Sequence, residues 1–297
     1  KKSRDNYGKL NKTHQNENTI IITEEMYMKN RRYLTKRCQS VAMAGVIAMM
    51  SGASAITVWA DGPGGSSSSQ SANEVGPSNP GSGSSGSSSQ TNPNAWKRSG
   101  SVYLMPDGSS INNVLRRGID VSRWQGDVNW SQVAADDVSF VMLGTRSKGE
   151  IDPYFHKNIQ EAAKAGVQIG AYIYSLATTP EMAVEEANFV LNLIREYPVS
   201  YPIAFDMEDE VQKVLSKEQL AQIANAFCST ISDAGYYPII YANEYWLNNH
   251  LDMSLMNYPV WVARYSVKPT YNSPVMWQAT STGSVKGING NVDIDFQ

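Results

Sequence analysis

The sequence predicts an α/β protein whose main domain is an irregular (β/α) barrel of the TIM type with degenerate last strands. From Arg117 onward, short apolar runs alternate with helical patterns, which is typical of parallel βαβ units. Eight such runs follow one another, which is enough strands to close a barrel. The helical patterns fade after the fifth run, so we expect the barrel to be regular at first and irregular last.

The eight apolar runs are the expected barrel strands. They cover residues 118–122, 140–144, 167–174, 202–207, 237–241, 259–263, 275–278 and 292–296. Three longer helices are expected between them, at residues 153–165, 180–196 and 216–234. The third has the clearest boundaries, because Ser216 and Gln219 fit a capping box and Gly235 follows its end.

The chain before and including this domain divides into five segments by composition. We expect a basic region at 1–37, a signal-peptide core or membrane anchor at 38–60, a disordered Gly/Ser-rich linker at 61–97, a lead-in at 98–116 and a catalytic domain at 117–297. The second segment has the apolar stretch and small residues of a secretory signal. An uncleaved anchor is the alternative, because the stretch is just long enough to span a bilayer. Both alternatives place the domain outside the cell or at its surface.

The charge is unevenly distributed along the chain. Residues 1–60 carry 10 Lys and Arg against 4 Asp and Glu, which leaves 15 and 24 in residues 61–297. An acidic folded part argues against nucleic acid as its ligand. Two cysteines, Cys38 and Cys228, are too few for a disulfide framework, and the three histidines lack the spacing of metal ligands. We therefore expect a monomer that uses no metal or cofactor.

The most informative motif is Asp206-Met207-Glu208, at the end of the fourth apolar run. Side chains at i and i+2 of a strand share one face, so both carboxylates are expected to leave the strand in the same direction. Neighbouring carboxylates repel, and one of them tends to keep its proton at neutral pH. A protonated acid beside an ionised partner is what cleavage of a glycosidic bond requires. Such acid-rich strand ends also occur as helix caps or solvated turns.

Further acidic and aromatic residues recur at the ends of the expected strands. The ends of parallel barrel strands meet at one rim, where active sites lie. Asp120 on the first strand and Asp293 on the last come from runs that are neighbours in a closed barrel. The aromatic residues that could stack on sugar rings are Tyr172, Tyr174, Tyr241, Trp261 and Trp277. Packing in the core or at the rim would explain any single one of them about equally well.

A set of motifs runs in one order through residues 117–297. They are Arg117-Gly118-Ile119-Asp120-Val121-Ser122, Gln125-Gly126, Asn129-Trp130, Asp152-Pro153-Tyr154-Phe155, Asn158, Ala165-Gly166, Gly170-Ala171-Tyr172, Asp206-Met207-Glu208, Trp261-Val262-Ala263-Arg264-Tyr265, Trp277-Gln278 and Gly290-Asn291-Val292-Asp293. In this order they resemble the glycoside hydrolase family 25 lysozymes, the N-acetylmuramidases often called Chalaropsis-type. The resemblance implies a (β/α)-type barrel that cleaves the β-1,4 bond between N-acetylmuramic acid and N-acetylglucosamine in peptidoglycan. It also implies Glu208 as general acid/base, Asp206 as its partner carboxylate, and Asp120 and Asp293 as further acidic residues of the site.

Two positions depart from the family's pattern. Asn129 stands where the family commonly has Asp, and Ile173 stands where many members carry His. We expect both side chains to lie outside the site.

Two other functions remain open from the residues. A chitinase-like hydrolase would also use a carboxylate pair at a strand end, but the longer Asp-x-x-Asp-x-Asp-x-Glu run is absent. A non-catalytic glycan-binding protein would keep the aromatic residues without needing Glu208. For the second chemical step, Asp206 either attacks the anomeric carbon or orients the substrate's acetamido group, and we favour the acetamido route.

Overall fold

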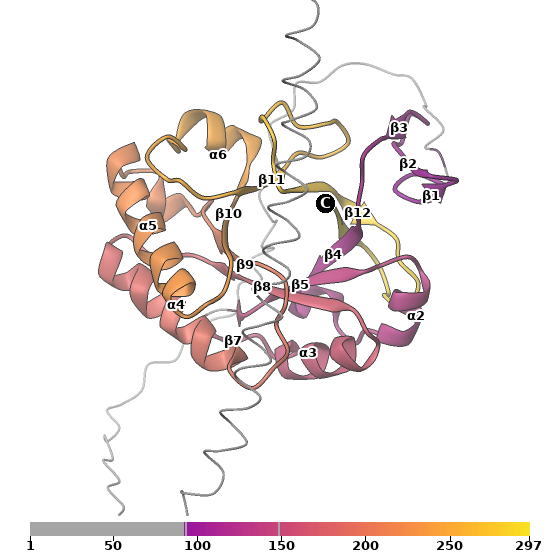
Figure 1. Ribbon diagram of the computed structural model, residues 1–297, viewed down its shortest axis with the longest axis horizontal. Coiled ribbons are helices and arrows are strands. Elements are labelled where there is room, and N and C mark those ends of the chain that lie inside the picture. The colour runs from indigo at the N-terminus through magenta and orange to yellow at the C-terminus, as the bar shows by residue number, and fades with distance from the viewer. Residues whose placement is uncertain (1–91, 93, 148) are drawn as a thin grey trace, which may run out of the picture. The chain divides into compact units, whose positions relative to one another are not determined.

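The protein is described here by a computed structural model that covers residues 92, 94–147 and 149–297. Eight strands form a closed barrel in the order β4-β5-β8-β9-β10-β11-β12-β13, which confirms the predicted fold (Figure 1). The basic region, the signal or anchor segment and nearly all of the expected linker lie outside the described residues. Within the described residues, no helix has the length and hydropathy to cross a membrane.

The barrel strands follow the predicted apolar runs closely. They are β4 (Arg117–Val121), β5 (Phe140–Gly144), β8 (Gln168–Tyr174), β9 (Ile203–Asp206), β10 (Pro238–Asn243), β11 (Val260–Ala263), β12 (Met276–Gly283) and β13 (Val292–Phe296). The three predicted helices are α3 (Phe155–Lys164), α4 (Pro180–Ile194) and α5 (Lys217–Asp233). The capping box of Ser216 and Gln219 is present at the start of α5.

The sequence analysis missed several short elements. They are the helices α2 (Trp130–Ala135) and α6 (Glu244–Asn249), the 3₁₀ turns η1 (Arg123–Gln125) and η2 (Glu210–Gln212), and the strands β6 (Arg146–Ser147) and β7 (Glu150–Ile151). None is long enough to establish a hydrophobic period. Each follows the carboxyl end of a barrel strand or connects two of them, so these elements shape the rim of the barrel.

One strand does not follow the parallel pattern that the sequence predicted. The barrel strands from β4 to β12 run parallel to one another. The last strand, β13, is antiparallel to both of its neighbours, β12 and β4. The β12–β13 connection spans residues 284–291 and is too short for a parallel crossover, which needs a dozen or more residues. The amino-terminal end of β13 therefore lies at the rim formed by the carboxyl ends of the other strands, and Asp293 lies opposite Asp120.

The barrel interior is filled with large side chains rather than open. Phe140, Met142, Tyr241 and Trp261 are among its buried residues. Two glycines leave room for them, because a Cβ at Gly118 would lie 2.3 Å from the ring of Phe140, and one at Gly170 would lie 2.4 Å from the Met142 sulfur. A second layer of core separates the outer face of the strands from the helices.

A small antiparallel sheet covers the outside of the barrel near β12 and β13 (Figure 1). It consists of β1 (Arg98–Ser99), β2 (Val102–Leu104) and β3 (Ser110–Ile111). The ring centroid of Trp96 lies 6.1 Å from Trp277 and 6.2 Å from Phe296, and that of Tyr103 lies 5.1 Å from Phe296. Residues that the sequence placed at the end of the linker and in the lead-in thus pack on the barrel. They cover strands that have no helix following them.

Candidate active site

The Asp206-Met207-Glu208 motif lies at the carboxyl end of β9. Ala204 belongs to the barrel interior, whereas Phe205 and Met207 are buried in the outer core. Because side chains alternate along a strand, Asp206 and Glu208 are on the interior side, at the mouth of the barrel. Asp206 is 5% exposed and Glu208 is half-buried. The pair is therefore shielded from bulk water but still within reach of a ligand at the mouth.

Glu208 is held by an asparagine that the sequence analysis did not select. The Asn243 side-chain NH₂ donates to Glu208 Oε2 at 2.9 Å. The Asn243 Oδ1 accepts from the backbone N–H of Trp246 at 3.0 Å, so the amide is fixed at both ends. Burial raises the pKa of Glu208, and the Asn243 hydrogen bond acts in the opposite direction. A cap-forming residue directly after a barrel strand was the sequence signal for Asn243.

Asp206 is buried with an unused hydrogen-bond acceptor. Its Oδ1 has no hydrogen-bond partner among the described residues. Burial raises the pKa of Asp206 well above its ordinary value, and the negative charges of Glu208 and Asp120 raise it further. Buried polar atoms are nearly always hydrogen-bonded, so an orphaned acceptor at a barrel mouth suits a donor on a ligand.

A second group of carboxylates forms the floor of the site. Asp120 Oδ2 accepts from Gln278 Nε2 at 2.7 Å, and Asp295 Oδ1 accepts from Trp261 Nε1 at 2.9 Å. Asp120 and Asp295 are also hydrogen-bonded to each other. Burial raises the pKa of both; the Asp295 charge raises that of Asp120 further, and the Asp293 charge raises that of Asp295. Burial and the Asp120 charge raise the pKa of Asp293 to about 9. The Asp120–Asp295 pair therefore keeps a proton at neutral pH.

Gln278 connects this floor to the aromatic residues at the mouth. Its Oε1 accepts from the hydroxyls of Tyr241 at 2.8 Å and Tyr265 at 3.0 Å, while its NH₂ donates to Asp120. Gln278 and Tyr265 were part of the motifs that carry the resemblance, but no pattern in the sequence assigned them a role. Asp295 stood with Asp293 among the acidic residues of the last expected strand but was not selected as a site residue; in the structure it accepts from the Trp261 indole N–H.

The structure brings together four of the five aromatic residues that the sequence selected. The Trp261 ring lies 6.2 Å from that of Tyr172 and 4.6 Å from that of Tyr241. Tyr174 is 37% exposed at the rim and is hydrogen-bonded to Asp209.

Trp277 is the exception among these residues, because it lies on the other side of its strand. Gln278 faces the interior, so Trp277 faces outward; its indole N–H donates to the Arg264 carbonyl at 2.8 Å, and its ring packs against Trp96. Trp277 belongs to the packing between the barrel and the small sheet rather than to the acidic site. Ile173 also lies in the outer core, as expected.

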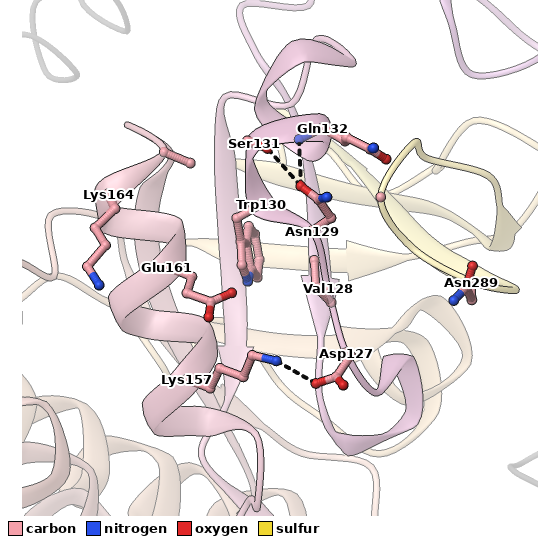
Figure 2. Close-up of a pocket in the computed structure, with 12 residues that line it drawn as sticks. Asp127, Val128, Asn129, Trp130, Ser131, Gln132, Lys157, Glu161, Lys164 and Asn289 are labelled. Carbon is pink, nitrogen blue, oxygen red and sulfur yellow. Dashed lines mark hydrogen bonds and ion pairs between the residues drawn. The ribbon is translucent and has the colours of Figure 1, made fainter.

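A hollow of about 660 Å³ lies elsewhere, against the start of α2 and along α3 (Figure 2). It is lined by polar and charged groups, including the ion pair between Lys157 Nζ and Asp127 Oδ1 at 2.6 Å. None of the carboxylates described above lines it. In the described part of the chain, no group of three or more His, Cys, Asp and Glu residues could hold a metal ion. Among the described residues, most of the buried carboxylates gather at the barrel mouth.

Comparison with known proteins gives the family. The profile of "Glycosyl hydrolases family 25" matches residues 119–288. The chain belongs to this family. It is accordingly a glycoside hydrolase.

Several curated proteins are similar to this family 25 chain. It is 30% identical over 188 residues to the uncharacterised protein YegX of Escherichia coli K12, a match that covers 60% of this chain and 68% of YegX. It is 28% identical over 182 residues to the autolytic lysozyme of Clostridium acetobutylicum, covering 60% of this chain and 55% of that enzyme. Lysozyme M1 of Streptomyces globisporus is 29% identical over 197 residues, with 60% and 66% covered.

Solved structures share the fold. The modular autolysin LytC of Streptococcus pneumoniae matches with a TM-score of 0.59 and 25% identity, covering 66% of this chain and 49% of LytC. A family 25 glycosyl hydrolase of Bacillus anthracis matches with a TM-score of 0.54 and 21% identity, covering 63% and 90%. These matches confirm the barrel that the sequence predicted.

Proposed function

We propose that this family 25 enzyme is a peptidoglycan hydrolase that cleaves the β-1,4 bond between N-acetylmuramic acid and N-acetylglucosamine. The observation that carries the proposal is the half-buried Glu208, held by Asn243 beside the buried Asp206. Two relatives are named lysozymes, and LytC has been solved with a synthetic peptidoglycan ligand. The acidic floor and the aromatic mouth suit a neutral, hydroxyl-rich glycan better than an anionic polymer.

Glu208 acts as the general acid in the first step. Burial raises its pKa, which favours the protonated form, and the Glu208 proton is donated to the glycosidic oxygen as the bond to the anomeric carbon breaks. The oxygen leaves as the hydroxyl of the released sugar. In the second step the Glu208 carboxylate takes a proton from the water that attacks the anomeric carbon. Its proton is thereby restored.

Asp206 orients the substrate's own nucleophile. The acetamido carbonyl of the muramic acid residue attacks the anomeric carbon, and Asp206 accepts a hydrogen bond from the acetamido N–H. This step requires the pair's proton to lie on Glu208 and Asp206 to be ionised in the complex, and the N–H donor at the buried Asp206 carboxyl favours that ionised form. The free Oδ1 of Asp206 supports this role, because that buried atom needs a donor that the described protein does not supply. Direct attack by Asp206, as in other retaining enzymes, is the alternative. A glycan without the N-acetyl group that is cleaved at the full rate would exclude the acetamido route.

The proposed site of action is outside the cell or at its surface. The support is the apolar stretch within residues 38–60, which resembles a secretory signal and otherwise serves as a single membrane anchor. Fractionation of producing cells, with amino-terminal sequencing of the mature protein, separates the alternatives. A full-length chain in the membrane fraction indicates an anchor, a shortened chain in the medium indicates cleavage, and a full-length chain confined to the cytoplasm would contradict export.

The identity of the new reducing ends tests the reaction. The full chain is incubated with purified peptidoglycan, the products are reduced with borohydride, and the reduced sugars are identified by mass spectrometry. We expect reduced N-acetylmuramic acid. Reduced N-acetylglucosamine would mean that the other glycosidic bond is cleaved. Intact glycan bound to the protein would favour a binding module instead.

A further inference from the structure

One large aromatic side chain at the catalytic rim is used neither by the core nor by the proposed reaction. Trp124 lies in η1, directly after β4, and is 70% exposed. Its indole N–H makes no hydrogen bond to any described residue. A ring of this size gains stability by burial, so exposing most of it leaves that stabilisation unused in the free protein.

The backbone that carries Trp124 is firmly held. The Arg123 N–H donates to Asp152 Oδ2 at 2.7 Å, and Asp152 is 2% exposed. The Ser122 N–H donates to Gln125 Oε1 at 2.9 Å within a capping box. Trp124 is therefore presented by an ordered turn.

The same turn is connected to the acidic site. Gln125 Nε2 contacts the Asn291 carbonyl at 3.4 Å, and Asn291 is two residues before Asp293, a site carboxylate. Asp120, another site carboxylate, is the last but one residue of β4, just before the turn. Around the barrel, β4 is separated from β9 by β5 and β8, so the turn lies across the mouth from Glu208. A glycan seated on Glu208 and extended across the mouth would run toward the turn that carries Trp124.

The arrangement of the ring leaves one face open. The Arg123 guanidinium carbon lies 4.4 Å from the Trp124 ring centroid, so the cation covers one indole face. This contact restricts the ring before any ligand arrives, which lowers the entropy lost on binding. Because the Trp124 side chain is 70% exposed, the part of the ring that Arg123 does not cover is open to a ligand. Among the other exposed rim aromatics, Tyr265 and Tyr174 have their hydroxyls hydrogen-bonded within the site, and Tyr245 packs on His250.

We propose that Trp124 is a stacking platform for a pyranose ring of the glycan strand, at a subsite separate from the one at which the bond is cleaved. The apolar C–H face of a pyranose ring fits the open indole face, and no charged ligand is required. This inference rests on the proposed function in naming the glycan as the occupant. It adds that the enzyme distinguishes long glycan strands from short ones.

The test compares substrates that differ only in length. Affinities of a peptidoglycan tetrasaccharide and octasaccharide are measured by calorimetry in full-length Glu208→Gln and Glu208→Gln/Trp124→Ala proteins. We expect Trp124→Ala to weaken octasaccharide binding by about tenfold more than tetrasaccharide binding, the size of one aromatic stacking contact. Trp124→Phe should restore most of this difference.

A matched control uses Leu115, which is 66% exposed and precedes β4 at the opposite end of the barrel. Leu115→Ala removes a similar exposed apolar side chain and should leave both affinities unchanged. Equal weakening of the two glycans by Trp124→Ala, or none, would overturn the platform. So would a concentration-dependent dimer that Trp124→Ala abolishes without any length-dependent effect.

The binding assay, combined with the product analysis, also shows whether the stacking role of Trp124 or the proposed hydrolysis is wrong. If the wild type binds long glycans more tightly through Trp124 but releases no products, the proposed hydrolysis is wrong and the platform stands. If the wild type releases N-acetylmuramic acid ends but Trp124→Ala has no length-dependent effect, the hydrolysis stands and the platform is wrong.

Discussion

The two halves of the barrel differ in how they are built and in what they contribute to the site. The strands β4 to β10 are parallel and are joined through helices, whereas β11 to β13 have almost no helix between them and end in an antiparallel strand. The regular half provides Asp206, Glu208 and Asn243, and the irregular half provides Gln278, Asp293 and Asp295. Regular βαβ packing thus positions the reacting groups, and the irregular half, together with Asp120 of β4, provides the floor that sets their electrostatic environment.

The largest effect should come from removing a carboxylate of the regular half. Asp206→Asn should lower kcat by about 10³-fold, because Asn keeps the shape but cannot stabilise the positive charge that develops on the acetamido group. Asp293→Asn, in the irregular half, should lower kcat by a clearly smaller factor. Rates are measured on purified peptidoglycan. Equal losses of kcat in the two variants would contradict the assignment of the reacting groups to the regular half and of their electrostatic environment to the irregular half.

The small sheet and Trp96, which pack on β12 and β13, should contribute to the stability of the fold rather than to the rate of hydrolysis. Trp96 is 7% exposed and packs on Trp277 and Phe296. Trp96→Ala should lower the free energy of unfolding by about 3 kcal/mol, the usual size for a large buried aromatic. The exposed neighbour provides the control, since Lys97→Ala should change the unfolding midpoint in urea little. An unchanged midpoint for Trp96→Ala would mean that the small sheet is not part of the folded unit.

The hydrogen bond from Asn243 should set the alkaline limit of activity. This bond favours the ionised form of Glu208, so its loss in Asn243→Ala raises the Glu208 pKa further above its ordinary value. A general acid must be protonated, and the rate falls as pH rises through its pKa. The alkaline limb of kcat should therefore move to higher pH in Asn243→Ala. A shift to lower pH would show that another group controls this limb.

The smallest predicted effect is a pH-dependent gain in stability. Burial raises the folded pKa values of Asp295 and Asp120, and the charges of Asp293 and Asp295, respectively, raise them further. Their contribution to stability is therefore full at acid pH and is lost as pH rises. Asp295→Asn removes one of these groups, while its amide can still accept from Trp261 and donate to Asp120. The variant should be more stable than wild type by about 1 kcal/mol at pH 8, with little difference at pH 4. Equal destabilisation at both pH values would contradict the proton-sharing pair.

Sequence patterns predicted the parts of this fold that depend on local burial. Runs such as Phe140 to Gly144 became strands because both faces of the barrel sheet are covered, and the ends of α5 were marked by its own cap. The direction of β13 was not predictable from its residues, because it depends on the short connection before it. The side of β12 that Trp277 occupies was also not predictable, for a different reason: Trp277 and Gln278 are adjacent and either could have faced inward.

The site was predictable where two acidic residues are neighbours in sequence. Asp206 and Glu208 share one strand end, so their proximity follows from the strand period alone. Asn243 and Gln278 reach the site from other strands, and an amide carries no charge pattern that would single it out. Asp295 required the register with β4, which only the closed barrel provides.

The most direct test of the account compares two neighbouring glutamates. Glu210 lies two residues after Glu208, has an 80% exposed side chain and pairs with Lys213 at the surface. Wild type, Glu208→Gln and Glu210→Gln are compared for kcat on purified peptidoglycan at the optimum pH. We predict that Glu208→Gln lowers kcat by about 10³-fold or more, because the variant loses the proton donor and leaves its partner carboxylate without it. Glu210→Gln should change kcat by no more than about twofold. A Glu208→Gln enzyme within about tenfold of wild type would contradict the assignment of the general acid to the end of β9.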